Sequence, residues 1–301
     1  MDLVLLNFFN QTLANPVLDV LMLALSTVAL GVIPVLIAGA FQRGRPQLGK
    51  TLIAATIAAA LFTALFYGLS MRPRPPLLYP VRLTIPPPAY ASFPSGHTSL
   101  VFANAVVMAL YLRRRRWWIL GLGWAASVGV SRLYLGHHFP SDVFAGAVMG
   151  AALGAAAYGW FCTNADPVRR LRWLLWPQVA LAVVVTEMAY LGILPLHLLA
   201  WPNSDKVLHF LLIGSVAFWL NLWWEGRRMP VTARLAVPPA LVAPFAVALT
   251  EEAFQALSPL RTASLVDLSA DLLGLIVFWY LAERVLRHTA RFAQPTASPP
   301  A

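Results

Sequence analysis

Long apolar stretches dominate the chain, and short polar segments separate them. Because a helix of about 20 apolar residues crosses a bilayer, each such stretch predicts a transmembrane helix. The pattern predicts an all-α integral membrane protein with about nine transmembrane helices in two bundles. The predicted spans are 17–41, 50–70, 97–112, 117–136, 139–161, 174–193, 207–224, 235–257 and 265–282.

Basic residues collect in alternate loops between these spans. By the positive-inside rule, the loops that carry them face the cytoplasm. We therefore expect a multi-pass protein of a bacterial-type inner (plasma) membrane, with its N-terminus outside and its C-terminus cytoplasmic. The loop residues in question are Arg43, Arg45 and Lys50; Arg113 to Arg116; Arg169, Arg170 and Arg172; Arg227, Arg228 and Arg234; and Arg284, Arg287 and Arg291.

A smaller set of basic residues lies on the predicted outer side, against this bias. Such exceptions indicate a chemical role for their charges. They are Arg72, Arg74, Arg82, Arg132, Lys206 and Arg261.

Composition agrees with the membrane class. The mean hydropathy is +0.69 and only 11% of residues are charged. A net charge of +10 is expected of a protein with basic cytoplasmic loops, so no nucleic-acid partner is inferred. The single cysteine, Cys162, excludes an intrachain disulfide and a cysteine-based metal cluster. The N-terminal segment lacks a basic region typical of a secretory signal and is expected to lie on the membrane surface.

Three polar segments fall on the outer side of the first bundle. They are "MRPRPP" at 71–76, "PSGH" at 94–97 and "SRLYLGHHFPSD" at 131–142. Their residue types suit a phosphate group. Arg72, Arg74 and Arg132 carry planar sets of donors that match phosphoryl oxygens. Ser95 is expected to be a helix N-cap, and Gly96 allows backbone amides to approach an anion.

The spacing of His138 and Asp142 distinguishes the two adjacent histidines. The two residues lie one helical turn apart, so the carboxylate can accept from one imidazole nitrogen and leave the other free as a nucleophile. His137 is one residue out of this register and is expected to point elsewhere. Taken alone, a His–Asp pair is also typical of a surface contact. A zinc site would need more ligands than the segment offers.

These residues resemble the type-2 phosphatidic acid phosphatase family, whose pattern is K-x6-R-P, then P-S-G-H, then S-R-x5-H-x3-D. The second and third motifs match in full, and the resemblance covers roughly residues 50–161. Arg74 and Pro75 match the first motif. Tyr67 stands at the family's lysine position, and Arg72 is a hypothetical substitute for that cation.

The resemblance implies a role for each matched residue. His138 would attack phosphorus and form a phosphohistidine, with Asp142 orienting its ring. His97 would protonate the leaving oxygen and then activate water. Arg74, Arg132, Ser95 and Gly96 would hold the equatorial phosphoryl oxygens. No metal and no cofactor is implied. The family also includes soluble vanadium haloperoxidases, a class that a chain with nine spans does not fit.

The second half, from about 170 to 290, places polar residues on the outer ends of four spans. The segment "DKVLHF", the pair Glu252 and Gln255, Arg261, and the pair Asp267 and Asp271 resemble the VanZ-like family over roughly residues 174–282, and the predicted domains are 1–165 and 170–290. This polar set is either an interhelical ion-pair network or a pocket for a lipid head group or cell-wall precursor. Its members are Asp205, His209, Glu252, Gln255, Arg261, Asp267 and Asp271.

The sequence thus predicts a metal-independent phosphatase that acts on a lipid phosphate at the extracytoplasmic face of the membrane. Undecaprenyl diphosphate is the favoured substrate, with phosphatidic acid, phosphatidylglycerophosphate and lipid A phosphates left open. One alternative is a non-catalytic lipid-binding or glycopeptide-resistance protein. Another is a transporter, although the chain shows no repeat typical of that class.

Overall fold

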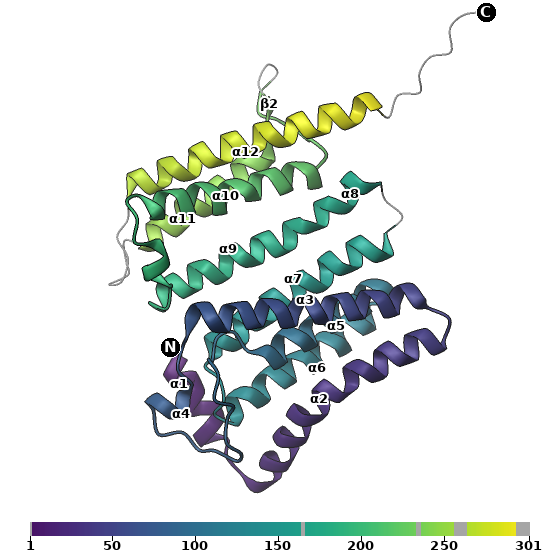
Figure 1. The fold of residues 1–301 in the computed structure, drawn as a ribbon, viewed down its shortest axis with the longest axis vertical. Helices are drawn as coiled ribbons and strands as arrows, with labels where there is room; N and C mark the ends of the chain where they lie inside the picture. Colours follow the sequence, from purple (N-terminus) through teal and green to yellow (C-terminus); the bar gives the residue numbers. More distant parts are fainter. Residues whose placement is uncertain (1, 164–165, 233–235, 256–263, 293–301) are drawn as a thin grey trace, which may run out of the picture. The chain divides into compact units, whose positions relative to one another are not determined.

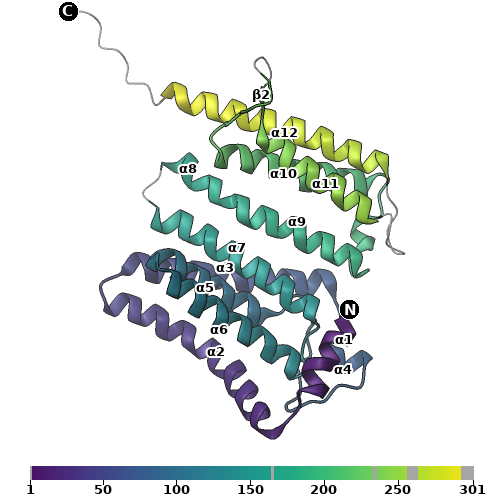
Figure 2. The same ribbon diagram turned by 180° about the vertical axis from the view of Figure 1, so that it is seen from behind.

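The computed structural model describes residues 2–163, 166–232, 236–255 and 264–292, and this part of the chain is almost entirely helical (Figures 1 and 2). The prediction of an all-α fold is confirmed. In chain order the elements are α1 (Asp2–Asn7), the π-helix η1 (Phe8–Thr12), α2 (Pro16–Gln42), α3 (Pro46–Ser70), α4 (Pro75–Leu78), α5 (Gly96–Leu112), α6 (Arg115–Tyr134), α7 (Pro140–Cys162), α8 (Pro167–Leu171), the 3-10 helix η2 (Arg172–Leu174), α9 (Leu175–Tyr190), the 3-10 helix η3 (Leu196–Leu199), α10 (Ser204–Trp223), β1 (Met229–Pro230), β2 (Ala236–Val237), α11 (Pro239–Gln255) and α12 (Leu265–Phe292).

Several of these helices are long and apolar enough to cross a membrane. Among the described residues there are six such helical segments, and α5 is a shorter apolar helix. The protein is therefore a multi-pass membrane protein. The count of nine spans stays a prediction, because α6 and α11 are not among these six segments. The six are Pro16–Gln42, Pro46–Leu78, Pro140–Cys162, Arg169–Tyr190, Ser204–Trp223 and Leu265–Thr289.

The chain divides into two compact units. The first consists of Met1–Asn164 and Val183–Pro195, and the second of Ala165–Ala182 and Leu196–Ala301. The division runs through α9, whereas the sequence placed the boundary between 165 and 170. The assignment of separate domains stays a prediction.

In the first unit, α5 and α7 pack closely because α7 carries glycines one turn apart. A Cβ added at Gly146 would lie 2.6 Å from the carbonyl oxygen of Ser95, and Cβ atoms at Gly150 and Gly154 would overlap the backbone of Ser99 and Ala103. Such small residues let two helix backbones approach. The N-terminal ends of α5 and α7 are thereby held side by side.

The first residues of the chain pack against this same end of the first unit, where both views place α1 and α4 (Figures 1 and 2). Asn10 is fully buried, and its side chain donates to the carbonyl oxygens of Arg82 at 2.8 Å and Tyr134 at 2.7 Å. The N-terminal segment was expected to lie on the membrane surface. That expectation stays a prediction; the segment also ties the α4–α5 loop to the end of α6, because Asn10 satisfies backbone groups of both.

In the second unit, α10 and α12 cross at two glycines. A Cβ at Gly214 would lie 2.7 Å from the carbonyl carbon of Gly274, so only the absence of side chains permits this approach. α11 packs against both helices, and the short strands β1 and β2 pair antiparallel between α10 and α11.

Candidate active site

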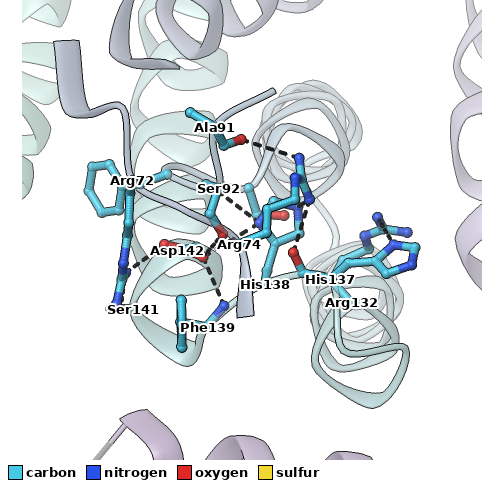
Figure 3. Close-up of polar contacts among 12 residues, drawn as sticks. Arg72, Arg74, Ala91, Ser92, Arg132, His137, His138, Phe139, Ser141 and Asp142 are labelled. Atoms are coloured by element: carbon cyan, nitrogen blue, oxygen red, sulfur yellow. Dashed lines mark hydrogen bonds and ion pairs between the residues drawn. The ribbon is translucent and has the colours of Figure 1, made fainter. Parts of the chain in front are cut away.

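The first and third polar segments predicted from the sequence meet where Arg72 and Arg74 lie beside Asp142 and His138 (Figure 3). The first follows α3, the second opens α5, and the third links α6 to α7. The backbone N–H of Ser95 donates to the carbonyl oxygen of Asp142 at 2.8 Å. This bond joins the start of α5 directly to the first turn of α7, so the second and third segments share one site.

The Asp142 carboxylate lies at the start of α7 and is fully buried. Arg72 donates to it from Nη1 at 2.6 Å, and the backbone N–H of Phe139 donates at 2.8 Å. The hydroxyl of Ser92 donates through a short hydrogen bond to Oδ2, the same oxygen that accepts from Phe139, whereas Arg72 donates to Oδ1. A buried carboxylate is stable only with such partners, and the positive end of the helix dipole favours it further.

The imidazole of His138 lies beside two oxygen acceptors. Its Nδ1 is 2.8 Å from the carbonyl oxygen of Ser92 and 3.6 Å from Oδ2 of Asp142. The spacing predicted that Asp142 faces Nδ1 of His138; the two groups lie 3.6 Å apart, and the Ser92 carbonyl is the closer partner of Nδ1. Both neighbours of Nδ1 are acceptors, so Nδ1 carries the proton and Nε2 presents its lone pair. That Nε2 lies 3.3 Å from Nη1 of Arg74.

His137 points away from His138, as the spacing predicted. Its Nδ1 accepts from Nη2 of Arg132 at 2.6 Å, and its Nε2 lies 3.0 Å from the carbonyl oxygen of Ile85. Nδ1 is therefore the acceptor and Nε2 the donor. His137 therefore holds Arg132 in place and contacts the α4–α5 loop through the Ile85 carbonyl.

Both histidines are kept neutral by their surroundings. Burial lowers the pKa of His137 to about 4, and the charge of Arg132 adds to this effect. Burial also lowers the pKa of His138 to about 4, although Asp142 acts in the opposite direction. Removing water penalises the charged imidazolium, so each ring stays unprotonated over the neutral pH range.

The three arginines have distinct surroundings. Arg74 is buried, and its guanidinium donates to the carbonyl oxygens of Tyr90, His137 and Ala91 at 2.9, 2.9 and 3.2 Å. Arg132 is buried as well, and it contacts Ser26 and His137. Its Nε has no hydrogen-bond partner among the described residues. This donor is available to a ligand.

Arg72 does not take the position that the sequence suggested. We hypothesised that it replaces the missing lysine as a phosphate ligand. The structure places its guanidinium on Asp142 and on Asp2, with Nη2 3.0 Å from Oδ2 of Asp2. The two carboxylates satisfy its charge, and Arg72 supports Asp142 instead.

A cavity of about 220 Å³ opens beside His138. Polar and apolar side chains share its lining, which is made by Leu30, Ala60, Thr63, Ala64, Tyr67, Tyr90, Gly96, His97, Leu100, Arg132 and His138. Ser95 is the N-cap of α5 as predicted, but its side chain makes no capping hydrogen bond to the helix backbone. Its Oγ accepts from the Thr98 hydroxyl at 2.9 Å.

Ser92 and Thr63 are site residues that sequence reasoning missed. Ser92 holds both His138 and Asp142, and Thr63 lines the cavity. Ser92 lies in a loop without periodicity, where nothing indicates a partner. Thr63 has the pattern of an ordinary residue of a transmembrane helix. Only its position four residues before Tyr67, one helical turn away, indicates that it shares a face with a site residue.

The polar residues of the second half pair across helices. Lys206 contacts Asp267 at 3.1 Å, and His209 contacts Asp271 at 3.1 Å, so α10 and α12 are joined by an ion pair and a His–Asp contact. Pairing between helices is one of the two arrangements that the sequence left open for this set. The structure also pairs Asp205 with Lys206. Arg261 lies outside the described residues.

The remaining two members of that set bond within or near α11. Gln255 donates to Glu251, and Glu252 accepts from the backbone N–H of Ser264. In the described part of the chain no three His, Cys, Asp or Glu side chains gather as a metal site would require.

Comparisons with known proteins point to the same half of the chain. Residues 19–166 match the PAP2 superfamily. The chain is 29% identical over 143 residues to the undecaprenyl-diphosphatase BcrC of Bacillus subtilis, a match that covers 46% of this chain and 73% of that protein. It is 36% identical over 113 residues to an undecaprenyl-diphosphatase of Sulfolobus acidocaldarius, covering 37% of this chain and 53% of that protein. The crystal structure of Aquifex aeolicus LpxE is 29% identical, with a TM-score of 0.47 and coverage of 52% of this chain and 93% of that chain.

Proposed function

From a PAP2 superfamily domain over residues 19–166, we propose that the protein hydrolyses a polyprenyl diphosphate such as undecaprenyl diphosphate at the extracytoplasmic face of the membrane. Two relatives that carry the name undecaprenyl-diphosphatase support this substrate. The coarser conclusion, a membrane lipid phosphatase, rests on the family match and the apolar helices together.

One observation carries the proposal. The cavity brings together His138, His97 and Arg132, and the Nε of Arg132 has no partner among the described residues. A buried donor without a partner costs free energy that a bound anion recovers. A phosphoryl group in this cavity would meet a neutral imidazole and a guanidinium at once.

In the first step, Nε2 of His138 attacks phosphorus. The N–P bond forms as the bond from phosphorus to the leaving oxygen breaks, and protonated His97 donates its proton to that oxygen. The charge that develops on the equatorial oxygens is stabilised by Arg132 and Arg74, with Ser95 and the Gly96 amide at the start of α5. For a lipid diphosphate, the product that departs is the lipid monophosphate.

In the second step, neutral His97 takes a proton from water, and the water oxygen attacks the phosphohistidine. The N–P bond breaks, inorganic phosphate leaves, and His138 regains its lone pair. Asp142 lies 3.6 Å from the protonated Nδ1. The negative charge of Asp142 stabilises the His138 ring while phosphorus is attached to it. Arg72 and Ser92 hold Asp142 in the position that this role requires.

The apolar part of the same cavity supports a lipid substrate. Leu30 of α2, Ala60 and Ala64 of α3, and Leu100 of α5 line it beside the polar groups. These residues lie within helices rather than in the loops, so an acyl or prenyl chain would leave the site among apolar side chains.

A non-catalytic lipid-binding or resistance protein is the second candidate, and Tyr67 in place of the family's lysine favours it. The VanZ-like resemblance of residues 170–290 stays a hypothesis. The ion pair and the His–Asp contact between α10 and α12 support the interpretation of that polar set as a packing network. We propose that the second half modulates the protein and does not supply groups for phosphoryl transfer.

Phosphate release by the purified full-length protein tests the proposal. The panel should contain undecaprenyl diphosphate, phosphatidic acid, phosphatidylglycerophosphate and lipid A, with His138→Ala as the control. We expect the diphosphate to be preferred, activity to survive EDTA, and vanadate to inhibit as an analogue of five-coordinate phosphorus. No phosphate release from any of these lipids would favour the binding protein, and loss in EDTA with rescue by a divalent ion would contradict the mechanism.

A further inference from the structure

Thr63 and Tyr67 present two hydroxyl groups on one face of α3. They are four residues apart, one helical turn, and both line the cavity that contains His97 and His138. We propose that these two hydroxyls form a neutral donor pair that binds a phosphoryl oxygen at the α3 wall of the cavity. The inference rests on the proposed function, since it assigns further ligands to the same phosphate.

Tyr67 reaches the start of α5. A Cβ added at Gly96 would lie 3.0 Å from the Tyr67 hydroxyl oxygen, so the phenol fills the space that a side chain at Gly96 would need. Its ring packs against Tyr90, with centroids 4.9 Å apart, and this fixes its direction. The hydroxyl thus lies where the backbone amides of a helix N-terminus favour an anion. A phosphoryl oxygen bound to those amides is within reach of it.

Thr63 supplies the second hydroxyl. Its side chain is 5% exposed, and its Oγ1 has no hydrogen-bond partner among the described residues. Two other threonines of α3 behave differently: Thr51 donates to the carbonyl oxygen of Gln47 at 2.7 Å and Thr56 to that of Leu52 at 2.8 Å. Threonine in a helix ordinarily satisfies its hydroxyl in this way. Thr63 lines the cavity, its methyl carbon lies on the side of Gly96, and its buried Oγ1 is left without a partner, which a ligand beside it would satisfy.

The surrounding charges explain why neutral donors are useful at this wall. Arg72 is paired with Asp2 and Asp142, and the guanidinium of Arg74 already donates to three backbone carbonyls. Arg132 of α6 also lines the cavity, and its Nε has no partner among the described residues. The hydroxyl pair completes the set of donors around the phosphoryl group and does so without a further buried cation, which would be costly to desolvate.

The test compares variants of the full-length protein that lose one hydroxyl and keep the shape. Tyr67→Phe and Thr63→Val should each weaken kcat/KM for undecaprenyl diphosphate and vanadate affinity on the order of 10- to 100-fold, as loss of a hydrogen bond to a charged group does. Vanadate affinity is measured from the concentration that half-saturates its thermal stabilisation of the protein. Thr63→Ser and Tyr67→Lys, which keep a donor, should retain affinity.

Matched controls remove hydroxyls elsewhere in the first unit. Tyr158→Phe loses a contact with Arg113 at 3.2 Å, and Thr27→Val loses a bond to the Leu23 carbonyl at 2.9 Å. Neither residue lines the cavity, so both variants should bind vanadate like the wild type. Wild-type vanadate affinity in Tyr67→Phe and Thr63→Val would overturn the inference. A wild type that binds vanadate but releases no phosphate would defeat the proposed function alone, and one that binds no vanadate would overturn both.

Discussion

The guanidinium of Arg72 lies on the carboxylate of Asp142, with Nη1 2.6 Å from Oδ1, and its plane faces the ring of Phe139 at 4.2 Å. Asp142 is fully buried and Arg72 nearly so. The pair joins the end of α3 to the start of α7 and holds the carboxylate beside His138. Arg72, which the sequence suggested as a phosphate ligand, therefore holds Asp142 in place.

Removing Arg72 should leave a buried carboxylate without its main partner. We expect Arg72→Ala to lower the free energy of unfolding by about 3–5 kcal/mol, the usual effect of breaking a buried ion pair from one side. Thermal unfolding in detergent measures the loss. Arg82→Ala is the control, because its pair with Asp19 is partly exposed and should contribute much less to stability. Equal losses in the two variants would contradict this difference.

The two adjacent histidines should respond differently to substitution. We expect His138→Ala to reduce phosphate release by about 10³-fold or more, because it removes the proposed nucleophile. Spacing alone predicted that His137→Ala keeps most activity. Because His137 holds Arg132 at 2.6 Å, we now expect a moderate loss, on the order of 10-fold and mainly in KM. A fully inactive His137→Ala beside an active His138→Ala would show that the nucleophile is misassigned.

Stability should fall in mild acid because both imidazoles are buried and neutral. Their pKa values are lowered to about 4, whereas a histidine of the unfolded chain titrates near pH 6.5, at about its ordinary pKa. Between these values the unfolded chain binds more protons, so stability is complete above about pH 6.5 and decreases as the pH falls toward about 4. Unfolding temperatures measured from pH 7.5 to 4.5 check this. His138→Gln should show a shallower decrease, and an identical slope would contradict the assignment.

The loop charges predict the sidedness of the protein and with it the membrane face of the site. We expect the segment from Met71 to Pro94 to be extracytoplasmic and Arg113 to Arg116 to be cytoplasmic. Leu78→Cys and Arg114→Cys, each in a Cys162→Ser background, should be labelled from opposite sides of the inner membrane by an impermeant thiol reagent. Labelling at position 78 only after that membrane is permeabilised would reverse the topology and the leaflet of the substrate.

The sequence alone determined the class of this protein and predicted most residues of the candidate site, although not Ser92 or Thr63. The backbone N–H and C=O groups of an apolar stretch of about 20 residues find all their hydrogen-bond partners within the stretch only when it is a helix. The all-α membrane fold therefore follows from composition and pattern. The motif spacing likewise identified the segments around Arg74, His97 and His138, and the match of residues 19–166 to the PAP2 superfamily confirms the resemblance on which their roles rest.

The tertiary structure decided which partner each of these residues has. His138 bonds to the Ser92 carbonyl, Arg72 pairs with Asp142, and His209 pairs with Asp271 across two helices rather than with Asp205 in its own. The unpartnered hydroxyl of Thr63 is also visible only in three dimensions. Spacing along a helix states which side chains share a face, but a buried polar group bonds to whichever donor or acceptor the packing of distant segments brings nearest.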